Sequence, residues 1–164
     1  MGNINIVDEI LAPKGSIIFE FAGKNPFVVV NMASGLLKDV MKITGKDVHE
    51  IDVRWDTTSD PREFYGIWKG KRTDDAWTKS YITIIIQGKY DLKNNSGAVR
   101  VELKGTVETG YDYSNFFQRG FWWMYNRSFY YKQRRNYIEF AKDNIYEIRA
   151  KMMDALGILH GEYA

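Results

Sequence analysis

Apolar and polar side chains alternate through the middle of the chain with a period of two. Four such segments, separated by the turn clusters TTSDP, TDD and NNSG, are VHEIDVRW, EFYGIWKG, YITIIIQGKY and AVRVELKGTVE. Alternation gives each face of a strand its own set of side chains, and short polar turns join antiparallel neighbours. Residues 48–109 are therefore predicted to form an antiparallel meander with one buried face and one largely solvated face.

A strand and a helix are expected before the meander. The strand is SIIFEF, residues 16–21, whereas the preceding stretch INIVDEI does not settle between strand and helix. Asn25 as N-cap and Pro26 at the first helical position favour a helix that Gly45 ends. Its apolar stripe consists of Val29, Met32, Ala33, Leu36, Val40 and Ile43. This stripe predicts that the helix packs on the sheet.

The last third of the chain is predicted to be one long helix. Residues 114–156 contain no proline, and Gly157 follows as a C-terminal stop. Large apolar residues recur every seven positions, at Phe117, Met124, Tyr131, Ile138, Ile145 and Met152. A seven-residue repeat drifts by about 20° per heptad on a straight helix, so we expect a bend, with Gly120 as its place.

These elements predict an α+β fold, in which a curved antiparallel sheet packs on a long C-terminal helix, with one N-terminal helix. The 164 residues fit a single domain, 1–164, because a chain of about 150 residues buries about 70% of the surface of its unfolded form. The strand at 16–21, the helix, the meander and the helix from Ser114 resemble, in this order, the helix-grip arrangement of the Bet v 1/START-like superfamily, which includes polyketide cyclase-like proteins. The resemblance implies a cavity between the long helix and the concave face of the sheet that holds a lipid, a sterol or another apolar molecule.

We therefore expect an apolar or amphipathic small molecule, or a lipid, as the ligand of that cavity. Aromatic residues on both faces of the central strands and the heptad line of the long helix supply the candidate ligand-binding residues. They are Trp55, Trp68 and Tyr81 from the sheet and Phe121, Met124 and Tyr131 from the helix. The resemblance implies no catalytic residue, because the superfamily shares none.

One stretch of the long helix has more aromatic residues than a core stripe requires. FWWMYNRSFYYKQRR, residues 121–135, has seven aromatic and four basic side chains and no acid. On a helical wheel, Trp122, Trp123 and two further rings fall among polar residues, on the side that faces water. The candidate surface patch is Arg119, Trp122, Trp123, Arg127 and Arg134. We expect one of the two tryptophans to be structural and the other to be at the surface.

Three interpretations of this patch stay open. In the first, the sheet, the first helix and the N-terminal segment bury the rings, with arginine stems lying along them. In the second, the protein is a non-enzymatic interaction module whose aromatic and basic face contacts a membrane surface or a second subunit. The third, nucleic-acid binding, is disfavoured because the net charge is only +2 and the rings lie on a helix rather than on a sheet.

No residue pattern in the sequence indicates a metal site. The chain has no cysteine, and its two histidines, His49 and His160, lack metal-ligand spacing to a partner. His49 alternates in line with Ile51, Val53 and Trp55. We therefore expect it to face the core as a hydrogen-bonded residue rather than as a base or a ligand.

The sequence also nominates no catalytic group. The carboxylate pairs Asp74–Asp75 and Asp52/Asp56 are interpreted as solvated charges in a turn and on the polar face of a strand. No phosphate-binding glycine loop and no Ser-His-Asp grouping is present, so we expect no cofactor, no metal and a binding role rather than an enzymatic one. The start MGNINIVDEI lacks a secretory pattern and no run of about 18 apolar residues occurs, so we expect a cytoplasmic protein.

Overall fold

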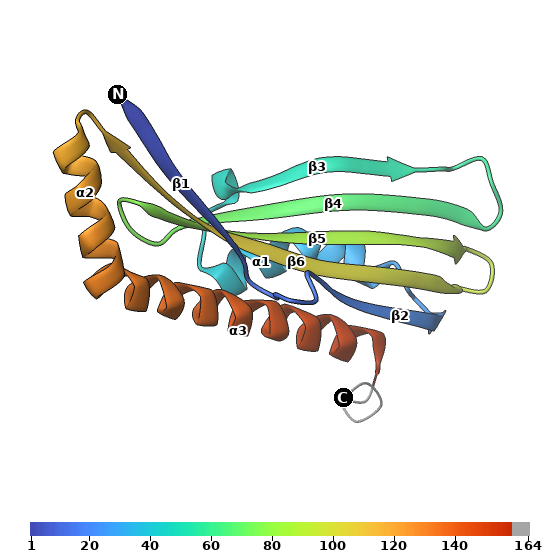
Figure 1. Ribbon diagram of the computed structural model, residues 1–164. Coiled ribbons are helices and arrows are strands. Elements are labelled where there is room, and N and C mark those ends of the chain that lie inside the picture. The colour runs from blue at the N-terminus through green and yellow to red at the C-terminus, as the bar shows by residue number, and fades with distance from the viewer. Residues whose placement is uncertain (159–164) are drawn as a thin grey trace.

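The computed structural model describes residues 1–158, so His160 lies outside the described residues. The chain forms an antiparallel sheet with helices against one of its faces (Figure 1). The elements are β1 (Gly2–Glu9), β2 (Ile17–Lys24), α1 (Val28–Met41), η1 (Gly45–Asp47), β3 (Val48–Trp55), β4 (Arg62–Thr73), β5 (Thr78–Asp91), β6 (Ser96–Tyr113), α2 (Phe116–Tyr125), η2 (Asn126–Tyr130) and α3 (Tyr131–Leu156). The predicted α+β fold class is confirmed, and the unsettled stretch near the N-terminus is strand β1.

The sheet is organised around the long strand β6. The strand order is β1-β6-β5-β4-β3, and β2 also pairs with β6. The first half of β6 pairs with β2, where Ile17 lies opposite Leu103, and the second half pairs with β1, where Ile4 lies opposite Tyr111. One 18-residue strand therefore holds both N-terminal strands along the same edge.

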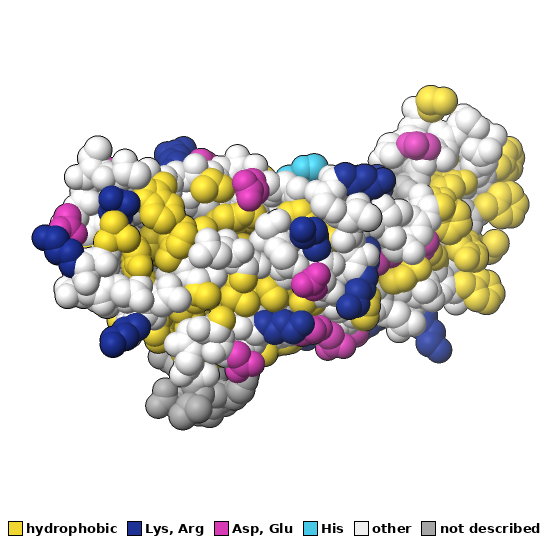
Figure 2. Space-filling view, turned by 180° about the vertical axis from the view of Figure 1, so that it is seen from behind, with side chains coloured by type: hydrophobic (Ala, Val, Ile, Leu, Met, Phe, Trp, Pro, Cys, Tyr) yellow, Lys and Arg dark blue, Asp and Glu magenta, His cyan; other side chains and the backbone are white. Residues whose placement is uncertain are grey.

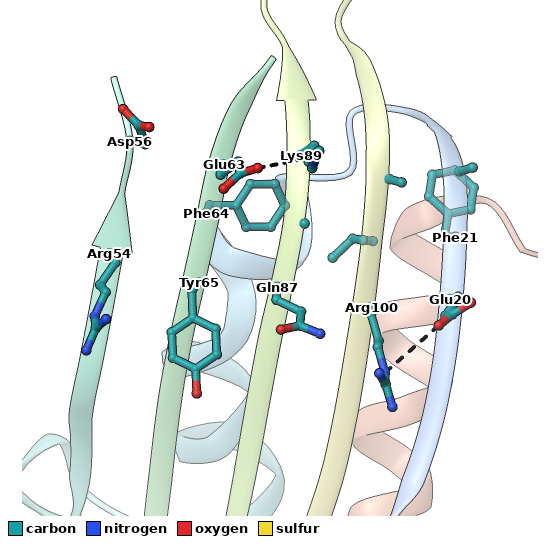
Figure 3. Close-up of a pocket in the computed structure, with 14 residues that line it drawn as sticks. Glu20, Phe21, Arg54, Asp56, Glu63, Phe64, Tyr65, Gln87, Lys89 and Arg100 are labelled. Atoms are coloured by element: carbon teal, nitrogen blue, oxygen red, sulfur yellow. Dashed lines mark ion pairs between the residues drawn. The ribbon is translucent and has the colours of Figure 1, made fainter. Parts of the chain in front are cut away.

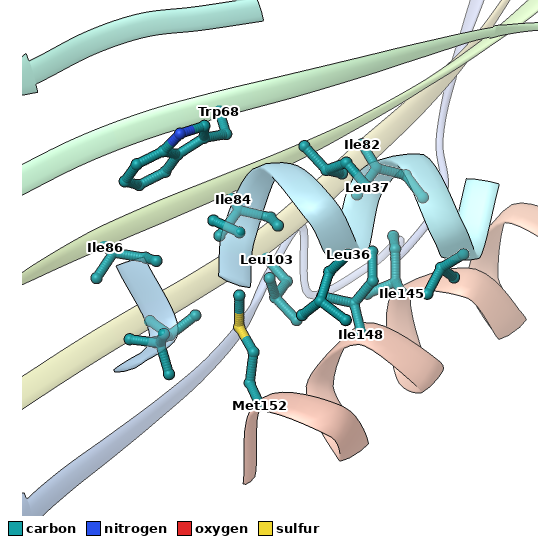
Figure 4. Packing of buried hydrophobic residues seen from close by; sticks show 14 of the residues in the cluster. Leu36, Leu37, Trp68, Ile82, Ile84, Ile86, Leu103, Ile145, Ile148 and Met152 are labelled. Atoms are coloured by element: carbon teal, nitrogen blue, oxygen red, sulfur yellow. The ribbon is translucent and has the colours of Figure 1, made fainter. Parts of the chain in front are cut away.

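The helix-side face of the sheet is filled with aliphatic side chains. Every second residue of β5 is fully buried at Ile82, Ile84 and Ile86. These residues belong to one core cluster with α1 and α3 (Figure 4). Its fully buried helical members include Val29, Leu37, Met41, Ile145, Ile148 and Met152. The alternation predicted for the meander therefore determines which face of the sheet receives the helices.

The edge strand β3 departs from the predicted alternation. The pairing register with β4 shifts between Glu50 and Asp52, which makes Ile51 an extra residue on β3. Such a bulge reverses the facing of every later side chain. His49 and Trp55, expected on one face, therefore lie on opposite faces. The prediction of a core-facing His49 is wrong, because that residue is exposed on the open face of the sheet.

The C-terminal helix bends at η2, a π-helical turn, rather than at the predicted Gly120 (Figure 1). A π turn holds more residues than an α turn and is a recognised cause of kinks. With this turn, four residues spaced by four are all buried, namely Trp122, Asn126, Tyr130 and Arg134. The first half of the predicted heptad line is consequently wrong, since Phe117, Met124 and Tyr131 are exposed. Its second half is confirmed, with Ile145 and Met152 fully buried.

Two isoleucine substitutions test the assignment of the core. Ile84 is fully buried and Ile51 is 57% exposed on the edge strand. We expect Ile84→Ala to lower the free energy of unfolding by about 2–5 kcal/mol, because it leaves a cavity under both helices. Ile51→Ala, the matched control, should change it by less than about 0.5 kcal/mol. Urea denaturation followed by circular dichroism measures both, and equal losses would contradict the described packing.

Candidate functional site

The principal candidate site is an exposed aromatic surface on the C-terminal helix near its bend. Within α2 only Trp122 is buried. The exposed large apolar residues from α2 to the start of α3 are Phe116, Phe117, Phe121, Trp123, Met124, Tyr125, Phe129 and Tyr131. We call these eight residues the aromatic face. Figure 2 shows hydrophobic side chains gathered at the end of the molecule where α2 lies.

The apolar side of α2 is turned away from the protein. At 100° per residue, Phe116, Phe117, Phe121 and Met124 cover an arc of about 140°. Trp122 lies on the opposite side of the helix and is the residue that packs on the body. An amphipathic surface helix normally buries its apolar side. In α2 the apolar side faces solvent instead, and it has no partner among the described residues.

The body holds α2 through few contacts. The Trp122 ring stacks on Tyr111 of β6, with ring centroids 5.4 Å apart and planes 19° apart. At the N-terminus of the helix, the Asn115 side chain caps it by accepting a hydrogen bond from the Gln118 N–H. Trp122 is 3% exposed and Trp123 is 43% exposed, which confirms that one tryptophan is structural and the other is at the surface.

Basic side chains without ion pairs border the aromatic face. Arg119, Arg127, Lys132 and Arg135 are exposed, and residues 113–138 contain no Asp or Glu. Within residues 1–158, none of the four forms an ion pair. The face therefore carries a net positive charge, with Glu139 as the acidic group that acts on Arg135.

Two residues of the predicted surface patch belong to the interior instead. Trp122 is the anchor of α2, and Arg134 is buried in an ion pair with Asp8 of β1, with 3.1 Å between nitrogen and oxygen. Arg134 also donates a hydrogen bond of 3.3 Å to the Asn126 side chain. Both lie on the buried line that the π turn creates, which helical spacing alone did not predict. Arg119, Trp123 and Arg127 are at the surface as expected.

The six residues nominated for an internal ligand do not come together. Phe121, Met124 and Tyr131 lie on the aromatic face, and Trp68 lies in the core. The indole N–H of Trp68 donates a hydrogen bond of 3.2 Å to Glu50. The two remaining sheet residues, Trp55 and Tyr81, lie on opposite faces of the sheet.

Trp55 and Tyr81 illustrate how the sheet separates the nominated residues. Trp55 is on the helix-side face at the edge strand, 40% exposed, with its ring 4.1 Å from that of Phe27. Tyr81 is half-buried on the open face, where the Lys69 ammonium lies 4.6 Å from its ring centroid. The ligand cavity between the helix and the sheet stays a prediction, and aliphatic core residues occupy the corresponding region.

A broad hollow of about 890 Å³ lies mainly over the open face of the sheet. Side chains from neighbouring strands cross it in a row, and Figure 3 shows Arg54, Tyr65, Gln87 and Arg100 side by side. Its charges are largely paired. The Lys89 ammonium is 3.2 Å from Glu63, and the Arg100 guanidinium is 3.9 Å from Glu20. Three acidic and three basic side chains line the hollow, so its net charge selects no ligand of either sign, and the rest of its lining is more apolar than polar.

A polar cluster connects the β4–β5 turn to the bend of the C-terminal helix. One oxygen of Asp75 accepts hydrogen bonds of 2.8 Å from the N–H groups of both Trp77 and Thr78. The other accepts from the hydroxyls of Tyr130, at 2.6 Å, and Tyr137, at 3.1 Å. The Tyr130 hydroxyl also contacts the Thr78 hydroxyl. The turn is thereby fixed to a part of the chain 55 residues away.

The neighbouring Asp74 is part of the same polar region. Its carboxylate lies 2.8 Å from the Arg72 guanidinium, and both side chains are nearly buried. Arg72 in turn lies over the Phe140 ring of α3, 4.4 Å from its centroid. The interpretation of Asp74 and Asp75 as solvated charges is wrong. Asp74 pairs with Arg72 of the sheet, and Asp75 accepts hydrogen bonds from Tyr130 and Tyr137 of the distant helix.

Hydrogen bonding decides the ionisation of this cluster. Burial acts to raise the pKa of Asp75, but the bonds from Tyr130, the two backbone N–H groups and Tyr137 outweigh it, and the pKa ends below its ordinary value of 3.8. Burial, followed by the bond to Asp75, raises the pKa of Tyr130. At neutral pH the carboxylate is charged and the phenol keeps its proton.

Within residues 1–158, no three His, Cys, Asp or Glu side chains are grouped as potential metal ligands.

No protein-family model and no curated protein matches this sequence. Among solved structures it is similar to a protein of unknown function from Staphylococcus aureus, at 9% identity over 94% of this chain and 95% of that one, with a TM-score of 0.30. An uncharacterized protein from Rhizobium leguminosarum shares 9% identity over 90% and 99%, with a TM-score of 0.22. Ara h 8.0201, a Bet v 1-like allergen, shares 8% identity over 81% and 99%, with a TM-score of 0.18.

Removal of one hydroxyl tests the polar cluster. We expect Tyr130→Phe to lower the free energy of unfolding at pH 7 by about 1.5–3 kcal/mol, because it removes a partly buried hydrogen bond to a carboxylate. The pKa of Asp75 is below 3.8 in the folded protein, so its charged form stabilises the fold above that pH and loses this effect as the pH falls below it. The difference between Tyr130→Phe and the parent should therefore shrink below about pH 3.8.

Urea titrations between pH 3 and pH 7 measure this difference. Tyr146→Phe is the matched control, because Tyr146 is 45% exposed on α3, and its effect should stay within about 0.5 kcal/mol at every pH. A difference that is independent of pH would show that the Tyr130 hydroxyl stabilises the fold through its contact with Thr78 rather than through its hydrogen bond to the Asp75 carboxylate.

Proposed function

We propose that this protein is an interaction module that docks peripherally on an anionic membrane surface through its aromatic face. One observation carries the proposal. The apolar side of α2 faces solvent and is bordered by Arg119, Arg127, Lys132 and Arg135, with no acidic side chain in residues 113–138. An amphipathic helix with these two properties lies in the plane of a membrane interface.

The apolar part of the attraction comes from burial of rings. Removing a phenylalanine side chain from water contributes about 1.5–3 kcal/mol. Phe117 is 74% exposed and Phe121 is 66% exposed, so most of that contribution is still available for binding. Trp123 and Tyr125 suit the headgroup region, where rings with a polar edge are enriched. Among residues 1–158, none of the helices has the length and hydropathy that a membrane span requires.

The electrostatic part comes from the four unpaired cations. A Lys or Arg near an anionic leaflet contributes about 1 kcal/mol, and this contribution decreases within a Debye length of about 8 Å at physiological ionic strength. The proposal therefore requires binding that is stronger on anionic than on neutral lipid and weaker at high salt.

A second copy of the chain fits the face less well than a lipid surface does. A two-fold contact places the same patch of both copies together. Arg119 and Arg127 of one copy would then approach those of the other, and like charges facing each other oppose association. An anionic lipid surface neutralises these charges instead.

Aromatic and basic substitutions separate the two parts of the attraction. We expect Phe117→Ala combined with Phe121→Ala to weaken binding to anionic vesicles by at least about tenfold, since 1.4 kcal/mol corresponds to a factor of ten. Arg119→Gln combined with Arg127→Gln should weaken binding to anionic vesicles and reduce its salt dependence. Co-sedimentation with phosphatidylglycerol and phosphatidylcholine vesicles at several salt concentrations measures both.

The control removes large exposed side chains elsewhere. Leu92→Ala combined with Tyr146→Ala changes residues that are 50% and 45% exposed and lie outside the aromatic face, so vesicle binding should be unchanged. Circular dichroism checks that every variant is folded. If the parent protein instead fails to bind vesicles and self-associates in a way that the Phe117/Phe121 variant abolishes, the partner of the aromatic face is a second copy of the chain rather than a membrane.

A further inference from the structure

A second, smaller pocket lies where the β4–β5 turn meets the bend of the C-terminal helix. Its volume is about 360 Å³. We call it the bend pocket, and its lining residues are Asp75, Ala76, Trp77, Tyr125, Phe129, Tyr130 and Gln133. Two of them, Tyr125 and Phe129, also belong to the aromatic face, so the pocket borders that face.

Three aromatic rings are set around the bend pocket at complementary angles. The Trp77 ring is nearly perpendicular to those of Tyr125 and Tyr130, at 76° and 78°, with centroids 6.0 and 5.3 Å away. The two tyrosine rings are close to parallel, at 27°, with centroids 6.1 Å apart. Phe129 extends the wall beside Tyr125, with 6.0 Å between centroids. Grouped ring faces of this kind attract a cation through their quadrupoles.

The same pocket contains a carboxylate without a counter-ion. Asp75 is half-buried, and within residues 1–158 it forms no ion pair. Its hydrogen bonds keep its pKa low, so it carries a full negative charge at neutral pH. Negative charge and aromatic faces therefore act in the same direction, and both favour a positively charged ligand.

The hydrogen bonds of Asp75 also restrict the kind of cation. A carboxylate offers about four acceptor positions, and Asp75 already accepts from two N–H groups and two hydroxyls. A primary ammonium entering the pocket would lose water without gaining acceptors from this group, which is costly. A cation whose charge is covered by methyl groups needs no acceptor and gains contact with the rings.

We propose that the bend pocket binds a quaternary ammonium group, such as the trimethylammonium group of choline. Trp77 and Tyr125 supply ring surface beside the buried Tyr130, and Asp75 supplies the opposite charge without a direct hydrogen bond. The group belongs to a lipid headgroup or to a free small molecule. This inference does not rest on membrane docking, because a dissolved cation reaches the pocket equally well.

Binding of dissolved choline and tetramethylammonium to the full chain tests the proposal. Proton NMR should show upfield shifts of the methyl signal, since the methyl groups lie against ring faces, and titration gives the Kd. The neutral carbon isostere 3,3-dimethylbutan-1-ol should bind at least tenfold more weakly than choline. Equal binding of the isostere, or no binding of either cation, would overturn the proposal.

Variants identify the pocket residues. Tyr125→Leu should weaken choline binding about tenfold, within the range of a cation–π contact, while Tyr146→Leu, which removes an equally exposed ring elsewhere on the helix, should leave it unchanged. Asp75→Asn should weaken it by at least as much as Tyr125→Leu. Because Asp75 also holds the turn, Asp75→Asn is interpreted only if circular dichroism shows the parent fold. If Asp75→Asn does not fold, Tyr125→Leu alone decides. Unchanged choline binding in Tyr125→Leu contradicts the site.

Vesicles separate the two sources of the group. If phosphatidylcholine vesicles displace choline, and Tyr125→Leu binds them more weakly, the natural ligand is a lipid headgroup. If they do not displace it, the ligand is a free cation. The Phe117→Ala/Phe121→Ala variant should keep its choline affinity, so failure of membrane docking and failure of the bend pocket give different results.

Discussion

The hydrogen bonds that Asp75 accepts from Tyr130 and Tyr137 fix the place where the C-terminal helix meets the sheet. Beyond this point the core is aliphatic, and α3 follows the sheet by burying Ile145, Ile148 and Met152. At the bend itself the contacts are polar, with Thr78 and Thr109 fully buried beside Tyr130. A polar contact has a defined direction and geometry, whereas aliphatic packing tolerates sliding. The cluster therefore sets the register of the helix on the sheet and, with it, the direction of α2.

The π turn at η2 has a second consequence for side-chain placement. It keeps Trp122, Asn126, Tyr130 and Arg134 on the buried side, although their spacing of four would drift on a regular helix. Every large apolar residue between these positions is then forced outward. The exposure of the aromatic face is thus not a local defect of α2. It follows because the residues that anchor the helix at the bend are polar or, like Trp122 and Tyr130, aromatic with a polar group.

The spacing of apolar residues along the sequence predicted the buried face of the sheet and the helix that covers it. Alternation in β5 and β6 identified the buried face, and the stripe of α1 identified the helix that covers it. The facing of His49 was not predictable, because a single extra residue at Ile51 reverses an alternating pattern without changing its composition. The role of Asp75 was not predictable either, since its hydroxyl partners lie 55 and 62 residues away. Surplus aromatic residues did indicate that the helix had more than a core face.

The aromatic face and the bend pocket share Tyr125 and Phe129, and this overlap constrains how the two proposed activities combine. A helix lying in a membrane interface places its exposed rings at the level of the headgroups. The bend pocket opens beside these rings, so a docked protein would present Trp77 and Asp75 to headgroups rather than to acyl chains. Arg127 is exposed on the π turn that also carries Phe129, so its charge is available to a headgroup phosphate. The arrangement fits an ordered headgroup layer better than a hydrocarbon interior, because its charged groups remain at the polar boundary of the membrane.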